Sequence, residues 1–210
     1  MTADSHALAT TEEHTPLTGL AHDSRGGISN VVLGMLLFIT SEVMFFAGLF
    51  AAYFNTRASN SPWPPEEFAH ILNPFSIILV ATIILITSSV TCQLAVWAIR
   101  RNDRTGFLRN IGFTFVLGVI FLLLQAYDYS ILFGEGMTLG SGPFGTTYFT
   151  ITGFHGAHVF GGVIMLGVVL YRGMAGQFSS RHHDAVEAAS LYWHFVDVVW
   201  ILLFSILYFL

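Results

Sequence analysis

Long apolar stretches separated by short polar segments dominate the sequence. A helix needs about 20 mostly apolar residues to cross the hydrocarbon core of a bilayer, and five stretches reach that length. Their approximate limits are residues 31–54, 74–99, 111–133, 144–171 and 188–210. Membrane strands would instead alternate apolar and polar residues over about ten positions, and runs such as FSIILVATIILI do not. The pattern therefore predicts an all-α polytopic membrane protein, a bundle of five transmembrane helices.

Basic residues collect in the cytoplasmic loops of membrane proteins, so their distribution predicts the orientation of the bundle. All eight basic residues are arginines. Arg57 lies alone on one side of the predicted spans. The others fall on the opposite side: Arg25, Arg100, Arg101, Arg104, Arg109, Arg172 and Arg181. We expect the N-terminus to be cytoplasmic and the C-terminus to face outward.

Residues 1–30 are polar and contain no apolar segment of the kind found in signal peptides. Their composition predicts a disordered cytoplasmic tail, so that the folded membrane domain covers residues 31–210. His6, His14 and His22 recur every eight residues in this tail. Metal binding there would need a framework that holds the three side chains together, and the sequence offers none.

Composition narrows the classes of function. Charged residues make up 10% of the chain, against roughly a quarter in average soluble proteins. The net charge of −5 argues against a nucleic-acid partner, because nucleic acids require a basic surface. The single cysteine, Cys92, excludes an internal disulfide and any thiolate cluster for zinc, iron–sulfur or paired copper ions.

Ionisable side chains inside the predicted spans are the best pointers to function, because an acid at a helix centre costs about 2.5 to 3.5 kcal/mol even on a lenient scale. Candidates in the middle or inner half of the membrane are Glu42, His155, His158, His194 and Asp197. Their depth predicts a buried polar cluster, in which pairing would offset the cost of desolvation. For Glu42 the expected partner is a histidine of the fourth span.

Several interpretations of this cluster stay open. Paired side chains can have a purely structural role and tie helices together. A proton or ion pathway would need groups that reach both surfaces, and only Asp128 lies toward the outer side. A bis-histidine haem site needs facing histidines on two helices, and His155, His158 and His194 supply at most one such site. A metal ion held by His155 and His158 would need a third ligand.

Small residues predict how the bundle packs. Gly153, Ala157 and Gly161 are spaced by four in the fourth span, and Gly162 adds to this row, a pattern that lets a neighbouring helix approach closely. We therefore expect the fourth span to be central. Asp184 and Glu187 come just before the last span and are typical of an N-cap residue and a first-turn acid.

Four segments of the sequence resemble subunit III of haem-copper terminal oxidases. They are SEVMFFAGLFAAYF in the first span, LLLQAYDY in the third, TGFHGAHVFGG in the fourth and HHDAVEAASLYWHFVDVVWILLFSILYF at the end. The resemblance covers residues 31–210 in the family's order, and HGxH followed about forty residues later by YWHFVDVVW is very specific. The mitochondrial subunit has seven helices, so five predicted spans resemble the compact bacterial forms.

The resemblance implies an accessory subunit without a redox centre, in which no residue is catalytic or binds a cofactor or metal. Haems and copper would lie in subunits I and II, the expected protein partners, in the plasma membrane of a bacterium. The resemblance also implies phospholipid bound in a helix cleft, a dioxygen route through that lipid, and support of proton uptake and lasting turnover in subunit I of a proton-pumping oxidase. It is compatible with membership of a respiratory supercomplex.

The resemblance also suggests roles for single residues. Glu42 matches a buried carboxylate that reacts with hydrophobic carbodiimides. Arg172, fourteen residues after His158, matches an arginine that holds a lipid phosphate. The lipid-binding candidates are therefore Arg172, Glu42 and His158. Signature positions with a structural and lipid-lining role are matched by His155, His158, His194 and Asp197.

Two short motifs bear on the electron donor. The subunit of quinol oxidases tends to carry SD and FWHFLDVVW where this chain has Ser41-Glu42 and YWHFVDVVW, which favours cytochrome c as donor. The equivalent subunit of a quinol oxidase is the alternative. A stand-alone transporter or a metal-dependent membrane enzyme also stays open, although a transporter would need broken helices or an internal repeat and the halves of the sequence show no repeat.

Overall fold

The structure, a computed structural model, describes residues 29–69 and 77–210. Within these ranges the chain forms, in order, α1 (Asn30–Ser59), α2 (Glu66–Ala69), α3 (Ile77–Arg100), α4 (Arg104–Gly134), α5 (Pro143–Met174) and α6 (Asp184–Tyr208). Five of these described helices, all except the short α2, are long and apolar enough to cross a membrane. The predicted all-α bundle of five spans is confirmed. Most of the expected tail, including its three histidines, and the start of the second span lie outside the described residues.

The helices are longer than the apolar runs, and their ends include polar residues. α4 begins at Arg104 rather than near residue 111. The carboxylate of Asp103 accepts a hydrogen bond from the backbone N–H of Gly106 at 2.9 Å and so caps this earlier start. α1 likewise continues through Arg57 to Ser59.

The start of α6 corrects one expectation. The N-cap residue is His183, and Asp184 is already the first residue of the helix. The reason lies in the backbone, since the carbonyl of His183 accepts the first hydrogen bonds, from the N–H groups of Val186 and Glu187. Asp184 and Glu187 both lie in the first turn, where a negative charge is favourable.

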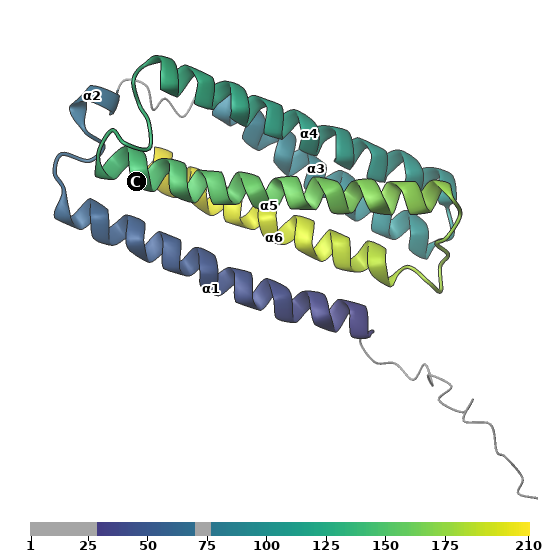
Figure 1. The fold of residues 1–210 in the computed structure, drawn as a ribbon. Coiled ribbons are helices and arrows are strands. Elements are labelled where there is room, and N and C mark those ends of the chain that lie inside the picture. The colour runs from purple at the N-terminus through teal and green to yellow at the C-terminus, as the bar shows by residue number, and fades with distance from the viewer. Residues whose placement is uncertain (1–28, 70–76) are drawn as a thin grey trace, which may run out of the picture.

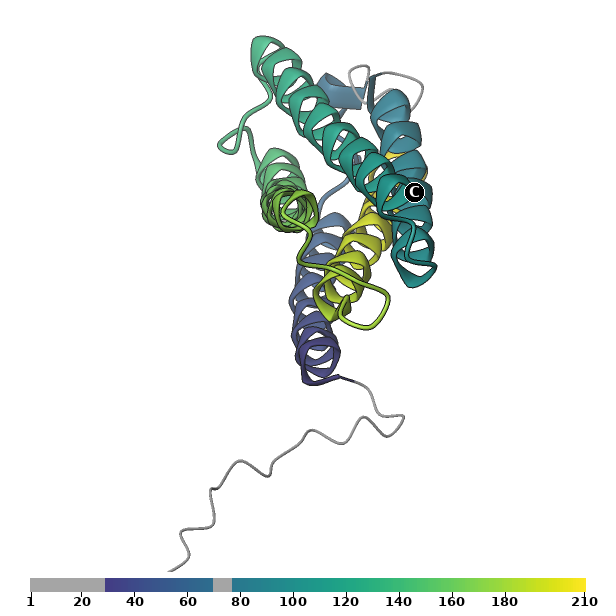
Figure 2. The same ribbon diagram turned by 90° about the vertical axis from the view of Figure 1, so that its right-hand side faces the viewer.

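The five long helices lie side by side along one direction (Figure 1). α3, α4, α5 and α6 form a closed group in which each helix contacts two others of the group. α1 packs on the outside of this group, against α5 and α6. Figure 2 shows that α5 and α6 separate α1 from the pair formed by α3 and α4.

Trp193 of α6 lies at the centre of the core and is fully buried. α4 and α5 come close to it through glycines, because a Cβ atom at Gly118 or Gly162 would lie 2.6 or 2.8 Å from its ring. A Cβ atom at Gly153 or Gly161 would meet nothing closer than 3.7 Å. Of the predicted small residues, Gly162 therefore lies where α6 approaches most closely, together with Gly118 of α4, whereas Gly153 and Gly161 do not lie at a close approach.

The helices differ in how much of their apolar surface is buried inside the bundle. The most apolar stretch of α6 is 56% buried, against 33% in both α3 and α5, 28% in α4 and 6% in α1. α5 contacts α1, α4 and α6, as expected for a central helix, but α6 is enclosed more deeply. α5 and α6 each contact three other long helices, whereas α1, α3 and α4 contact two each, so α5 and α6 form the inner part of the bundle.

Candidate functional site in the helix bundle

Glu42 of α1 and His158 of α5 form a polar contact inside the bundle. The Glu42 Oε2 and His158 Nε2 atoms are 2.9 Å apart, and the side chains are 18% and 17% exposed. The Nδ1 atom of His158 lies 2.7 Å from the backbone carbonyl of Phe154. A carbonyl only accepts hydrogen bonds, so Nδ1 carries a proton and Nε2 shares another with Glu42. The pair is neutral overall, whichever of the two side chains holds the shared proton, and this is the histidine partner expected for Glu42.

Two aromatic rings of α1 pack on the histidine of this pair, and a tyrosine of α6 bonds to its backbone. The ring of Phe45 stacks on His158 with centroids 5.9 Å apart, and Phe46 meets it edge-on at 4.9 Å. The hydroxyl of Tyr192 in α6 donates to the backbone carbonyl of His158 at 3.1 Å. The contact therefore links α1, α5 and α6 at one place, and it supports α1 where little else is buried.

His155 lies one turn before His158 on α5 but has different surroundings. Its ring is fully buried and stacks on Trp200 of α6 with centroids 4.9 Å apart and an interplanar angle of 27°. Phe121 of α4 meets it edge-on at 6.0 Å. Neither ring nitrogen has a hydrogen-bond partner among the described residues. His155 is a packing residue of the core in this structure.

His194 faces α3, away from Glu42. Its Nδ1 atom is 2.6 Å from Oγ of Ser89, and its Nε2 atom is 3.3 Å from Oε1 of Gln93. Asp197, one turn further along α6, also lies beside Ser89. Asp197 is only 4% exposed, and neither carboxyl oxygen has a hydrogen-bond partner among the described residues.

The five polar residues predicted as one cluster thus occupy three places. Glu42 and His158 meet between α1 and α5. His155 is enclosed by aromatic rings, and His194 and Asp197 lie between α6 and α3. Among the described residues, no three histidine, cysteine or acidic side chains come together as a metal site would require.

Sequence reasoning missed Ser89 and Gln93, which hold His194. Both are uncharged, so a search for ionisable groups passes over them. The signal that could have found them is the polar run TSSVTCQ from Thr87 to Gln93 within an otherwise apolar span. A second missed group lies toward the other end of the bundle, where the hydroxyls of Tyr148 and Tyr208 are 2.7 Å apart.

Arg172 lies in the last turn of α5. Its Nε atom donates to Oε1 of Gln177 at 2.9 Å, and its guanidinium carbon lies 4.9 Å from the ring centroid of Phe178. The terminal nitrogens make no hydrogen bond to the described part of the chain. One edge of the guanidinium is therefore held in place while its fork is available to a ligand.

Comparisons with known proteins agree with this architecture. Residues 18–210 match the family model described as cytochrome c oxidase subunit III. "Cytochrome c oxidase subunit 3" of Corynebacterium diphtheriae is 48% identical over 184 residues, which is 86% of this chain and 88% of the relative. "Probable cytochrome c oxidase subunit 3" of Mycobacterium tuberculosis is 42% identical over 199 residues, 93% of this chain and 95% of the relative.

The similarity extends to animals. "Cytochrome c oxidase subunit 3" of Sus scrofa is 42% identical over 180 residues, which is 83% of this chain and 67% of the relative. The matched region holds all five long helices and both histidines of the HGxH motif. The chain belongs to the cytochrome c oxidase subunit III family.

Proposed function

We propose that the chain is the cofactor-free accessory subunit of a proton-pumping respiratory cytochrome c oxidase in the plasma membrane of a bacterium. The observation that carries this proposal is the family match, which runs over residues 18–210 and includes all five long helices. The names of the bacterial relatives favour cytochrome c over a quinol as electron donor. The arginine distribution favours an orientation with the N-terminus in the cytoplasm.

Subunits I and II of the oxidase are the proposed partners, and subunit I is the one that this bundle packs against directly. The bundle offers a large apolar surface for such packing, since α1 is only 6% buried over its most apolar stretch. Leu37 and Met44 of α1 are 65% and 73% exposed. The contribution of the chain to the complex is support of proton uptake, dioxygen access and lasting turnover in subunit I.

Phospholipid is the proposed ligand, with Arg172, Glu42 and His158 as the residues that line its site. Arg172 follows His158 by fourteen residues, close to four helical turns, so both side chains project from nearly the same face of α5 about 21 Å apart. An arginine fork suits a phosphate, which it binds through two parallel hydrogen bonds. The rings of Phe45 and Phe154, 39% and 45% exposed, offer an apolar surface for an acyl chain near the pair.

Purification of the chain in mild detergent tests the assignment to an oxidase. Haem absorbance and larger subunits should migrate together with this chain, and the complex should oxidise reduced cytochrome c with uptake of dioxygen. Oxidation of a quinol but not of cytochrome c would assign the chain to a quinol oxidase instead. A colourless single polypeptide with its own transport or hydrolytic activity would contradict the proposal.

A further inference from the structure

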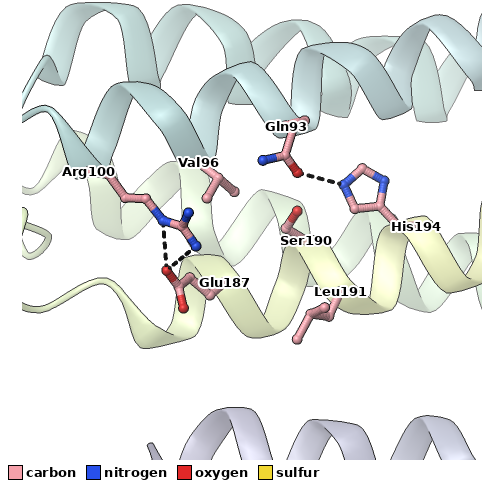
Figure 3. A pocket seen from close by; sticks show the side chains of 7 residues that line it. All are labelled: Gln93, Val96, Arg100, Glu187, Ser190, Leu191 and His194. Carbon is pink, nitrogen blue, oxygen red and sulfur yellow. Dashed lines mark hydrogen bonds and ion pairs between the residues drawn. The ribbon is translucent and has the colours of Figure 1, made fainter. Parts of the chain in front are cut away.

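A pocket of about 130 Å³ lies between α3 and α6 at the end of the bundle that carries most of the arginines (Figure 3). At its mouth, Nε and Nη2 of Arg100 donate to Oε1 of Glu187 at 3.0 and 2.8 Å. His194 and Gln93 lie at its inner end, and Ser190 lies between. Five of the seven residues that line the pocket are polar, and its volume exceeds the roughly 30 Å³ that one molecule occupies in liquid water, so the pocket can hold water.

Asp197 lies one turn of α6 beyond His194, further into the bundle. Ser89 is next to the Asp197 carboxyl and is also 2.6 Å from Nδ1 of His194. A serine hydroxyl has one proton to donate, so Ser89 cannot donate to His194 and to Asp197 at once. In the structure neither carboxyl oxygen of Asp197 makes a hydrogen bond within the described residues, so the Ser89 hydroxyl lies near the carboxyl and bonds to His194 instead.

We propose that this pocket is a water-filled inlet through which Asp197 exchanges a proton with the arginine-rich side, by way of His194 and Ser89. The ligand of the site is therefore water and the proton it delivers. The inference rests on the geometry of this chain alone and is independent of the proposed electron donor and of the lipid site.

Each proton that enters this chain of groups can be followed from the pocket to Asp197. It begins with an ionised Asp197, a hydroxyl on Ser89, and a neutral His194 that carries its proton on Nδ1. An arriving proton binds Nε2 of His194, the Nδ1 proton passes to the Ser89 oxygen, and the Ser89 proton passes to an Asp197 oxygen. The chain ends with Asp197 and Ser89 protonated and His194 neutral with its proton on Nε2, which then faces Oε1 of Gln93. The reverse sequence releases the proton to the pocket.

The surroundings of Asp197 favour a protonated resting state. An unpaired carboxylate inside a membrane bundle is costly, and Cys92 of α3 is a further ionisable group close to it. The ionisable groups that α1 and α5 bring toward α6 are engaged elsewhere, since Glu42 pairs with His158 and His155 stacks on a tryptophan. Among the described residues, Ser89 and Cys92 of α3 are therefore the neighbouring groups through which Asp197 could be reached from the pocket side.

Infrared spectroscopy of the purified oxidase complex tests the proposal. A protonated carboxyl has a C=O stretching band that shifts to lower frequency when its proton is replaced by deuterium. We expect Asp197→Asn to remove one such band, which assigns it. In the wild-type complex that band should shift after transfer to D₂O. Removal of a relay group in Ser89→Ala or His194→Phe should slow the shift about tenfold or more, which is 1.36 kcal/mol or more in the barrier.

Two matched variants separate the relay from general damage. Ser89→Thr keeps a hydroxyl at the relay position and should exchange at the wild-type rate. Thr87→Ala removes an exposed hydroxyl from the same helix, one that bonds only to the carbonyl of Ile83, and should also leave the rate unchanged. An Asp197 band that fails to exchange in the wild type, or that exchanges equally fast in Ser89→Ala and His194→Phe, would overturn the proposal. The proposal would also be overturned if Asp197→Asn removed no carboxyl band from the spectrum. The measurement follows a carboxyl and not oxidase activity, so its failure leaves the proposed function untouched.

Discussion

At the scale of single residues, Glu42 and His158 show how ionisable groups are accommodated inside a membrane bundle. The 2.9 Å contact lets the two side chains share one proton, and the carbonyl of Phe154 fixes which histidine nitrogen faces the acid. Either distribution of the proton leaves the pair neutral, which avoids the cost of an isolated charge. The contact also joins α1 to α5 at mid-length, where α1 has few other buried side chains.

The Glu42→Ala variant tests this role of the pair. It leaves Nε2 of His158 without its acid, a loss of roughly 1 to 3 kcal/mol, and it weakens the attachment of α1. We expect this chain to dissociate from the purified complex at a lower temperature than in the wild type. Glu42→Gln keeps a hydrogen-bond donor for Nε2 of His158, so its dissociation temperature should fall much less. Equal dissociation temperatures in the wild type and Glu42→Ala would contradict the role.

Arg172 provides the residue-scale test of lipid binding. Arg172→Ala removes the guanidinium fork, so the complex should retain less phospholipid after detergent washing and its catalytic lifetime should shorten. Arg172→Lys should recover only part of the loss, because an ammonium lacks the planar fork. The matched control is Arg101→Ala, since Arg101 is an exposed arginine that bonds to the carbonyl of Trp97 on its own helix. If mass spectrometry found the same lipid content in the wild type and in Arg172→Ala, Arg172 would not bind lipid. It would then be one of the arginines that only mark the cytoplasmic side of the membrane.

The sequence predicted part of this site, and physical reasons explain the rest. Glu42 and a histidine of the fourth span meet as expected, because an isolated acid at that depth has few alternatives. A single cluster was not found, because residues three apart, such as His155 and His158, point about 60° apart around a helix. Small rotations of packed helices then decide which neighbour each residue meets. Ser89 and Gln93 stayed unnoticed because they carry no charge.

At the scale of helices, one tryptophan determines how closely three of them pack. Trp193 of α6 lies against Gly118 of α4 and Gly162 of α5, where any side chain would collide with its ring. The apolar length of each run predicted the five spans, because a bilayer of fixed thickness demands that length. It could not predict helix ends, because polar residues continue a helix at the membrane surface and a cap such as Asp103 decides where it starts.

Gly118→Ala tests the packing around Trp193. The added Cβ atom would lie 2.6 Å from the indole ring, so α4 and α6 must separate, at a cost of about 1 to 3 kcal/mol. We expect a lower unfolding temperature for this chain within the purified complex. Gly112→Ala is the control on the same helix, because a Cβ atom there meets nothing within 4 Å. If both variants unfold at the wild-type temperature, the tryptophan contact does not limit helix packing.

At the scale of the whole molecule, the distribution of arginines predicts which end of the bundle faces the cytoplasm. The chain has one cysteine, Cys92, and it is buried, so engineered surface cysteines can be labelled selectively. Ser61 lies in the loop after α1 and Ser180 in the loop before α6, and each can be replaced by cysteine. A thiol reagent that does not cross membranes should label Ser61→Cys on intact cells and Ser180→Cys only after the membrane is opened. The reverse pattern would show the opposite orientation.

Removal of this chain from the purified complex tests the central claim most directly, that it supports an oxidase without carrying a redox centre. The haem absorbance and the copper content should stay with the remaining subunits, and electron transfer from cytochrome c to dioxygen should begin normally but decline after fewer turnovers. Addition of the chain back should restore lasting activity. Haem or copper that leaves with this chain, or a depleted complex that turns over as long as the intact one, would contradict the account.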